Sequence, residues 1–126
     1  MNFLNKNYKV RNAILGLPIE FNDICRFGDK KLEDLINLLH NQYIATEETQ
    51  NDSPTVEEFY NFLKKYPEVT FHGYAVSNKR DDYRVSIEGL EYAGDCSREL
   101  IVDFVKLCKS ADELDVETDY LRSWWD

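Results

Sequence analysis

The spacing of hydrophobic residues alternates between a helical and an extended period along the chain. Three stretches repeat apolar residues every three or four positions, and they predict helices at about 30–44, 54–65 and 97–109. The second helix has the clearest start, because Thr55 and Glu58 have the spacing of a capping box.

Alternating apolar and polar positions predict strands in the second half of the chain. The clearest pair lies at about 69–77 and 83–88, joined by a short polar turn into an antiparallel hairpin. Two shorter strands are expected near the C-terminus, one around Leu114 and Val116 and a last one at 120–125.

Residues 1–28 carry the weakest pattern. We read residues 9–15 as a short strand that ends at Gly16, and residues 19–21 as a second extended piece. The apolar alternation in both pieces is brief.

These elements predict an α+β fold. An antiparallel sheet, made of the central hairpin and the C-terminal strands, is expected to carry three helices mainly on one face. The length of 126 residues is close to the commonest domain size, so we expect residues 1–126 to form a single domain. The content of 43% hydrophobic and 31% charged residues is typical of a globular chain.

The hairpin predicts a candidate binding face on the side of the sheet away from the helices. With a five-residue turn, Tyr74 lies opposite Ser86 and His72 opposite Glu88, with Arg84 beside them. A carboxylate next to an imidazole orients it and favours its protonated form, which suits ligand binding or acid–base chemistry. The alternative is a solvated face with ordinary cross-strand pairs, since a one-residue slip in register would exchange the faces.

Trp124 and Trp125 are candidate interface residues. Neighbouring side chains of a strand face opposite sides, so one ring can join the core while the other is exposed. An exposed tryptophan often anchors a protein interface. The alternative is that both rings are buried.

The net charge of −9 is unevenly distributed. Residues 1–31 carry six basic and three acidic side chains (net +3), and residues 32–126 carry nine basic and 21 acidic ones (net −12). Direct binding to a nucleic acid needs clustered lysines and arginines, so the charge disfavours it. The same charge favours a basic protein partner, although it also serves solubility alone.

A calcium site near the C-terminus is disfavoured. Asp115, Glu117 and Asp119 match the first three odd positions of an EF-hand loop, but Tyr120 and Asp126 stand where that loop needs glycine and glutamate. We expect no metal and no cofactor.

The three cysteines do not predict a disulfide framework or a zinc site, because Cys25, Cys96 and Cys108 are odd in number and widely spaced. Cys96 precedes the third helix, whose N-terminus could lower the pKa of its thiol, with His72 as a partner. No catalytic motif surrounds either residue, so no catalytic residue is assigned.

A cytoplasmic protein without membrane contact is expected, because no stretch approaches the ~20 apolar residues of a membrane span and the first residues lack a signal-peptide pattern. The leading functional hypothesis is a non-enzymatic protein-interaction module. The alternatives are a small-molecule binder or enzyme that uses the His72/Glu88 face, and a nucleic-acid mimic or immunity-type inhibitor. The last is similar to bacterial immunity proteins in size and charge alone, so no residue is carried over. Self-association is left open.

Overall fold

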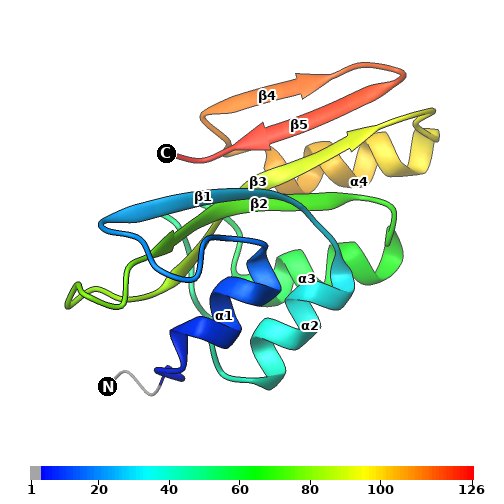
Figure 1. Cartoon of the computed structure of the whole chain (residues 1–126). Helices are drawn as coiled ribbons and strands as arrows, with labels where there is room; N and C mark the ends of the chain where they lie inside the picture. Colours follow the sequence, from blue (N-terminus) through cyan, green and yellow to red (C-terminus); the bar gives the residue numbers. More distant parts are fainter. Residues whose placement is uncertain (1–3) are drawn as a thin grey trace.

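The computed structural model describes residues 4–126, which form a five-stranded antiparallel sheet and four helices (Figure 1). The strand order across the sheet is β1-β2-β3-β5-β4. The predicted α+β class and antiparallel sheet are confirmed, with one helix more than the three expected. In chain order the elements are α1 (Tyr8–Leu15), β1 (Ile24–Lys30), α2 (Leu32–His40), α3 (Val56–Lys65), β2 (Thr70–Val76), β3 (Val85–Ala93), α4 (Arg98–Cys108), β4 (Glu113–Val116) and β5 (Tyr120–Trp124).

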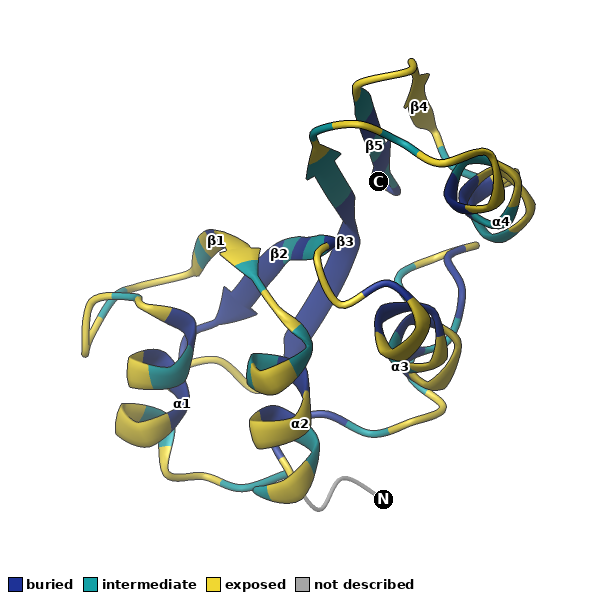
Figure 2. Cartoon of the chain, turned by 90° about the vertical axis from the view of Figure 1, so that its right-hand side faces the viewer, coloured by how far each residue is buried: buried dark blue, intermediate teal, exposed yellow. Residues whose placement is uncertain are grey.

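The hydrophobic core lies between the sheet and the helices, which cover one of its faces (Figures 1 and 2). Phe27 and Phe71 join β1 to β2 edge to face, with ring centroids 5.9 Å apart. Phe62 and Phe104 join α3 to α4, with centroids 6.2 Å apart. Each such side chain contributes roughly 1.5–3 kcal/mol by its removal from water.

Helix α3 begins as the sequence predicted. The Thr55 hydroxyl accepts a hydrogen bond from the Glu58 backbone N–H at 3.1 Å, and the Glu58 carboxylate accepts one from the Thr55 N–H at 3.0 Å. Helix α4 begins after Ser97, whose hydroxyl accepts from the Leu100 N–H at 3.1 Å. These caps satisfy N–H groups that have no partner within the helix.

The N-terminal prediction is wrong, because residues 9–15 belong to helix α1 and not to a strand. Asn7 caps the start of the helix, and Gly16 ends it in the left-handed conformation at φ 69°. The buried side of α1 includes the polar residues Arg11 and Asn12. A short helix that buries polar side chains lacks the apolar stripe on which recognition from sequence depends.

Strand β1 was not predicted at its true place, because the extended piece expected at residues 19–21 lies outside it. β1 is an edge strand in which Phe27 alone is buried, so its sequence shows no alternation. Its pairing with β2 shifts between Phe27 and Lys30, next to Asp29 at φ 55°. The shift is a β-bulge, which interrupts the outer edge of the strand.

The central hairpin is confirmed, and its register matches the prediction where Tyr74 lies opposite Ser86. The register then shifts by one residue, so that His72 lies opposite Gly89. Glu88 is the extra residue of this bulge. The predicted pairing of His72 with Glu88 is therefore wrong. The bulge was missed because an inserted residue leaves no sign in the alternation of the sequence.

The two tryptophans lie on opposite sides of the sheet. Trp125 is fully buried and packs edge to face on Phe59, with ring centroids 5.7 Å apart. Its backbone N–H donates to the Glu88 carbonyl at 2.7 Å, beyond the end of the β3–β5 pairing. Trp124 is partly exposed on the face away from the helices. We call this side the open face of the sheet.

Candidate functional site

His72 links three strands of the sheet. Its Nε2 lies 3.1 Å from the carbonyl oxygen of Ser123 in β5, which the ring reaches across Gly89 of β3. A Cβ at position 89 would lie 2.7 Å from the imidazole and 1.8 Å from the Ser123 oxygen, so the crossing requires glycine. The close approach of β3 and β5 therefore depends on glycine at position 89.

The environment of His72 favours the neutral imidazole. Burial lowers the pKa of His72 below its ordinary value of 6.5, Arg122 lowers it further, and the hydrogen bond to Ser123 opposes both. The ring is therefore mainly neutral at pH 7. The sequence had predicted the protonated form, next to Glu88.

Glu88 is buried and belongs to a different set of contacts. Its carboxylate forms an ion pair with Arg26 of β1, whose side chain is largely exposed. Burial raises the pKa of the Glu88 carboxyl above its ordinary 4.5, while Arg26 and a hydrogen bond from the Trp124 indole act in the other direction. Glu88 and His72 therefore do not form the predicted dyad.

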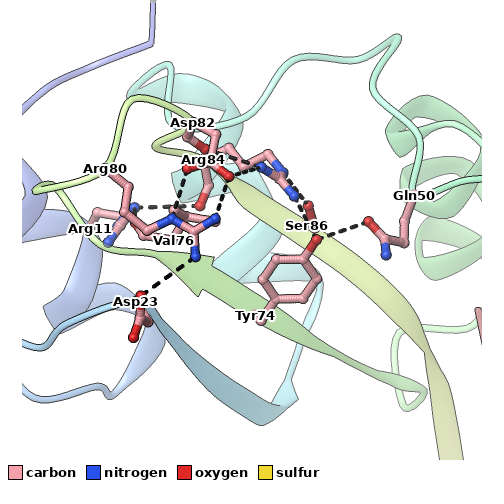
Figure 3. Close-up of polar contacts among 9 residues, drawn as sticks. All are labelled: Arg11, Asp23, Gln50, Tyr74, Val76, Arg80, Asp82, Arg84 and Ser86. Carbon is pink, nitrogen blue, oxygen red and sulfur yellow. Dashed lines mark hydrogen bonds and ion pairs between the residues drawn. The ribbon is translucent and has the colours of Figure 1, made fainter. Parts of the chain in front are cut away.

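Tyr74, Arg84 and Ser86 form a connected network on the open face (Figure 3). Arg84 donates to the Tyr74 hydroxyl at 2.8 Å and to the Ser86 hydroxyl at 3.1 Å, and it forms an ion pair with Asp82 at 3.1 Å. The Tyr74 hydroxyl donates to Gln50 at 3.1 Å. Tyr74 and Ser86 are buried, so this part of the face is less solvated than the sequence predicted.

A shallow polar depression of about 320 Å³ lies on the open face, between Arg26 and Trp124. Apart from Asp29, its charged groups are already engaged: Arg26 with Glu88, Arg122 with Glu113, and Glu91 with the Tyr120 hydroxyl. A charged ligand would have to displace these contacts. Ligand binding at this face stays a prediction.

Cys96 and Cys108 do not carry an activated thiol. Burial raises the pKa of Cys96, and the nearby Asp119 and Asp95 raise it further. Burial raises the pKa of Cys108 to about 12. Burial and the two carboxylates thus act against the thiolate that the following helix N-terminus would favour.

Strand β4 forms one outer edge of the sheet, and all four of its residues are exposed (Figure 1). The Glu117 N–H donates to the Tyr120 carbonyl at 2.8 Å, directed toward β5. Because alternate residues of an antiparallel strand bond to the same neighbour, Glu113 and Asp115 also direct their backbone groups toward β5. Leu114 and Val116 direct theirs outward.

The two sides of β4 differ in chemistry. On the open face, the Glu113 and Asp115 carboxylates lie 2.8 and 3.7 Å from Arg122. On the helix side, Leu114 and Val116 are 38% and 39% exposed. Helix α4, which contacts β4, also exposes aliphatic side chains, Val102 and Val105.

Residues 112–119, which we call the acidic edge, carry five acidic side chains and no basic one. Arg122 offsets one of these charges, so 5 − 1 leaves a net charge of −4. Trp124 lies opposite Glu113 in the adjacent strand, and opposed residues share a face. A partly exposed aromatic ring thus adjoins the carboxylates, an arrangement that suits a cationic side chain. Neither the carboxylates of the acidic edge nor the position of Trp124 depends on the register of the central hairpin.

Comparisons with protein-family models, with curated proteins and with solved structures find no match to this chain. No helix in residues 4–126 is long and apolar enough to cross a membrane. Within the same described range, no group of three or more His, Cys, Asp or Glu side chains has the geometry of a metal site.

Proposed function

We propose that this chain is a non-enzymatic protein-interaction module that binds a basic protein partner through the acidic edge. The observation that carries the proposal is the edge strand β4, whose residues are all exposed and which lies within the most acidic segment of the chain. An edge strand with no neighbour is a natural place for another chain to bind.

Electrostatics supports a basic partner. The acidic edge, with a net charge of −4 once Arg122 is counted, attracts cationic groups over about 8 Å at physiological salt. Complementary charge mainly speeds association and excludes partners of like charge. The partly exposed Trp124 adds an aromatic surface beside these charges. The aromatic ring fits the composition of protein interfaces, in which tryptophan is enriched, and the carboxylates fit their polar rim.

The remaining ionisable groups support binding over catalysis. His72 is bonded to a backbone carbonyl and Glu88 to Arg26, so both side chains already have partners within the sheet. The raised pKa of Cys96 disfavours a thiolate nucleophile.

The proposal is tested by titrating the ¹⁵N-labelled chain with an acetylated and amidated octalysine peptide. We expect chemical-shift changes centred on residues 112–119 and an affinity that falls steeply with salt. Replacing three carboxylates (Glu113→Gln, Asp115→Asn, Glu117→Gln) should weaken binding about 10-fold, at roughly 0.5 kcal/mol for each exposed charge.

A matched variant changes the net charge equally at exposed acidic residues elsewhere. It combines Glu33→Gln, Glu68→Gln and Asp81→Asn. This variant should bind octalysine nearly as tightly as the wild type at 150 mM salt, because those charges lie outside the acidic edge. If both triple variants lose the same affinity, the attraction is a property of the whole chain and the proposal is wrong.

A further inference from the structure

We infer that the partner adds an extended basic segment to β4 as a sixth, antiparallel strand of the sheet. This inference rests on the proposed function and gives it a binding mode and a partner chemistry. The occupant is a segment that alternates basic with aliphatic residues.

The backbone of β4 offers hydrogen-bonding groups to an added strand. Leu114 and Val116 each direct one N–H and one C=O away from β5, which gives four hydrogen-bonding groups along the outer edge. Both residues are exposed, and no strand formed by residues 4–126 lies next to β4 on that side. An added strand would pair with all four groups.

The side chains of β4 determine which residues an added strand would place on each face. In an antiparallel pair, residues directly opposite each other share a face. Residues opposite Leu114 and Val116 would lie on the helix side, the side of α4 with its exposed Val102 and Val105, where aliphatic side chains fit. The intervening residues would lie on the open face beside Glu113 and Asp115, where lysine or arginine fits. The alternation of acidic and aliphatic residues in β4 thus favours a partner that alternates basic with aliphatic residues.

A second copy of this chain is a poorer occupant. Pairing β4 with itself would bring two acidic edges together, and like charges in opposed positions are destabilising. The other outer strand, β1, is interrupted by its bulge between Phe27 and Lys30, with Asp29 at φ 55°. Such a bulge prevents a continuous ladder along that edge.

The inference is tested with four acetylated and amidated octapeptides at 150 mM salt. The first alternates lysine with valine, and the second has the same composition in two blocks, four lysines followed by four valines. The third and fourth are the alternating peptide with N-methyl groups on the two central valines or on the two central lysines. The valines carry the N–H groups that face β4 in the antiparallel arrangement, so N-methyl-lysine is the matched control.

We expect the alternating peptide to bind at least 10-fold tighter than the block peptide. N-methylation of the valines should weaken it about 10-fold or more, since two hydrogen bonds are lost, and N-methylation of the lysines should have little effect. Val116→Pro, which removes one outward N–H, should also weaken binding. Proline at an edge position with an outward N–H is compatible with a strand.

Equal affinity for all four peptides overturns strand addition, while octalysine binding that depends on the acidic edge would still support the proposed function. Loss of affinity on lysine methylation alone overturns the antiparallel orientation. Association of the chain with itself through β4, measured by sedimentation without peptide, overturns the choice of occupant. Failure of octalysine itself to bind removes the proposed function and this inference together.

Discussion

Replacing Trp125 with alanine tests whether the C-terminal residues close the hydrophobic core. The indole is fully buried, packs edge to face on Phe59 at 5.7 Å and donates to the Ser110 hydroxyl at 3.2 Å. Removing a buried aromatic side chain costs about 3–5 kcal/mol, and a value of about 4 kcal/mol fits a ring with both contacts. For a chain of 126 residues this lowers the Tm by about 15 °C.

The matched control is Trp124→Ala in the adjacent position. Trp124 is partly exposed on the open face, so we expect its loss to cost about 1 kcal/mol. The free energy of unfolding is measured by urea titration with far-UV circular dichroism, which does not depend on tryptophan fluorescence. If Trp124→Ala destabilises the fold as much as Trp125→Ala, the assignment of the two rings to opposite sides is wrong.

Three further predictions concern the open face and the strands beneath it. Gly89→Ala should lower the free energy of unfolding by about 3 kcal/mol or more, because its Cβ would lie 1.8 Å from the Ser123 oxygen. Gly28→Ala should be tolerated, since the nearest atom would lie 3.9 Å away. The Tm of Glu88→Gln minus the Tm of the wild type should become more positive from pH 3.5 to pH 7. The raised pKa of Glu88 means that its ionisation lowers the stability of the wild type as the pH rises above 4.5, and glutamine does not ionise. The pKa of the His72 imidazole should lie below 6.5 when measured by NMR. The wild type should lose more stability than His72→Gln from pH 7 to pH 5, because the unfolded chain binds the proton at a higher pH than the folded chain does.

Each of these predictions has a clear contrary result. Equal stability of the two glycine variants would show that β3 and β5 do not approach as closely as described. A Tm difference for Glu88→Gln that falls with rising pH would mean that the ion pair with Arg26 outweighs burial. Titration of His72 above 6.5 would restore the protonated imidazole predicted from the sequence.

The parts of the fold predicted from the sequence are those with local signals. Helix α3 follows from the capping box of Thr55 and Glu58, and the hairpin follows from its alternation and polar turn. Helix α1 was missed because Arg11 and Asn12 occupy its buried side. Arg11 is held there by backbone carbonyls and by the Tyr83 ring, 4.4 Å from its guanidinium, and these contacts come from other parts of the chain.

The candidate site could be predicted only in part. The sequence singled out Asp115, Glu117 and Asp119 only as a disfavoured calcium site, and the two-residue period placed one tryptophan on each side of the last strand. The period did not show which side is the core, since that depends on where α4 packs. The bulge at Glu88 separated His72 from its expected partner, and the preceding alternation contains no sign of it. The outward direction of the Leu114 and Val116 backbone groups required the strand order of the sheet.

The most direct test of the account is site-resolved hydrogen exchange of the Leu114 and Val116 amides, with and without the alternating lysine–valine peptide. We expect both amides to exchange fast in the free chain and to become protected at saturating peptide, while the already bonded Glu117 amide changes little. Protection of both amides before any peptide is added would show that the edge is already covered. Unchanged exchange at saturation would show that the peptide binds elsewhere, and either result contradicts the central claim.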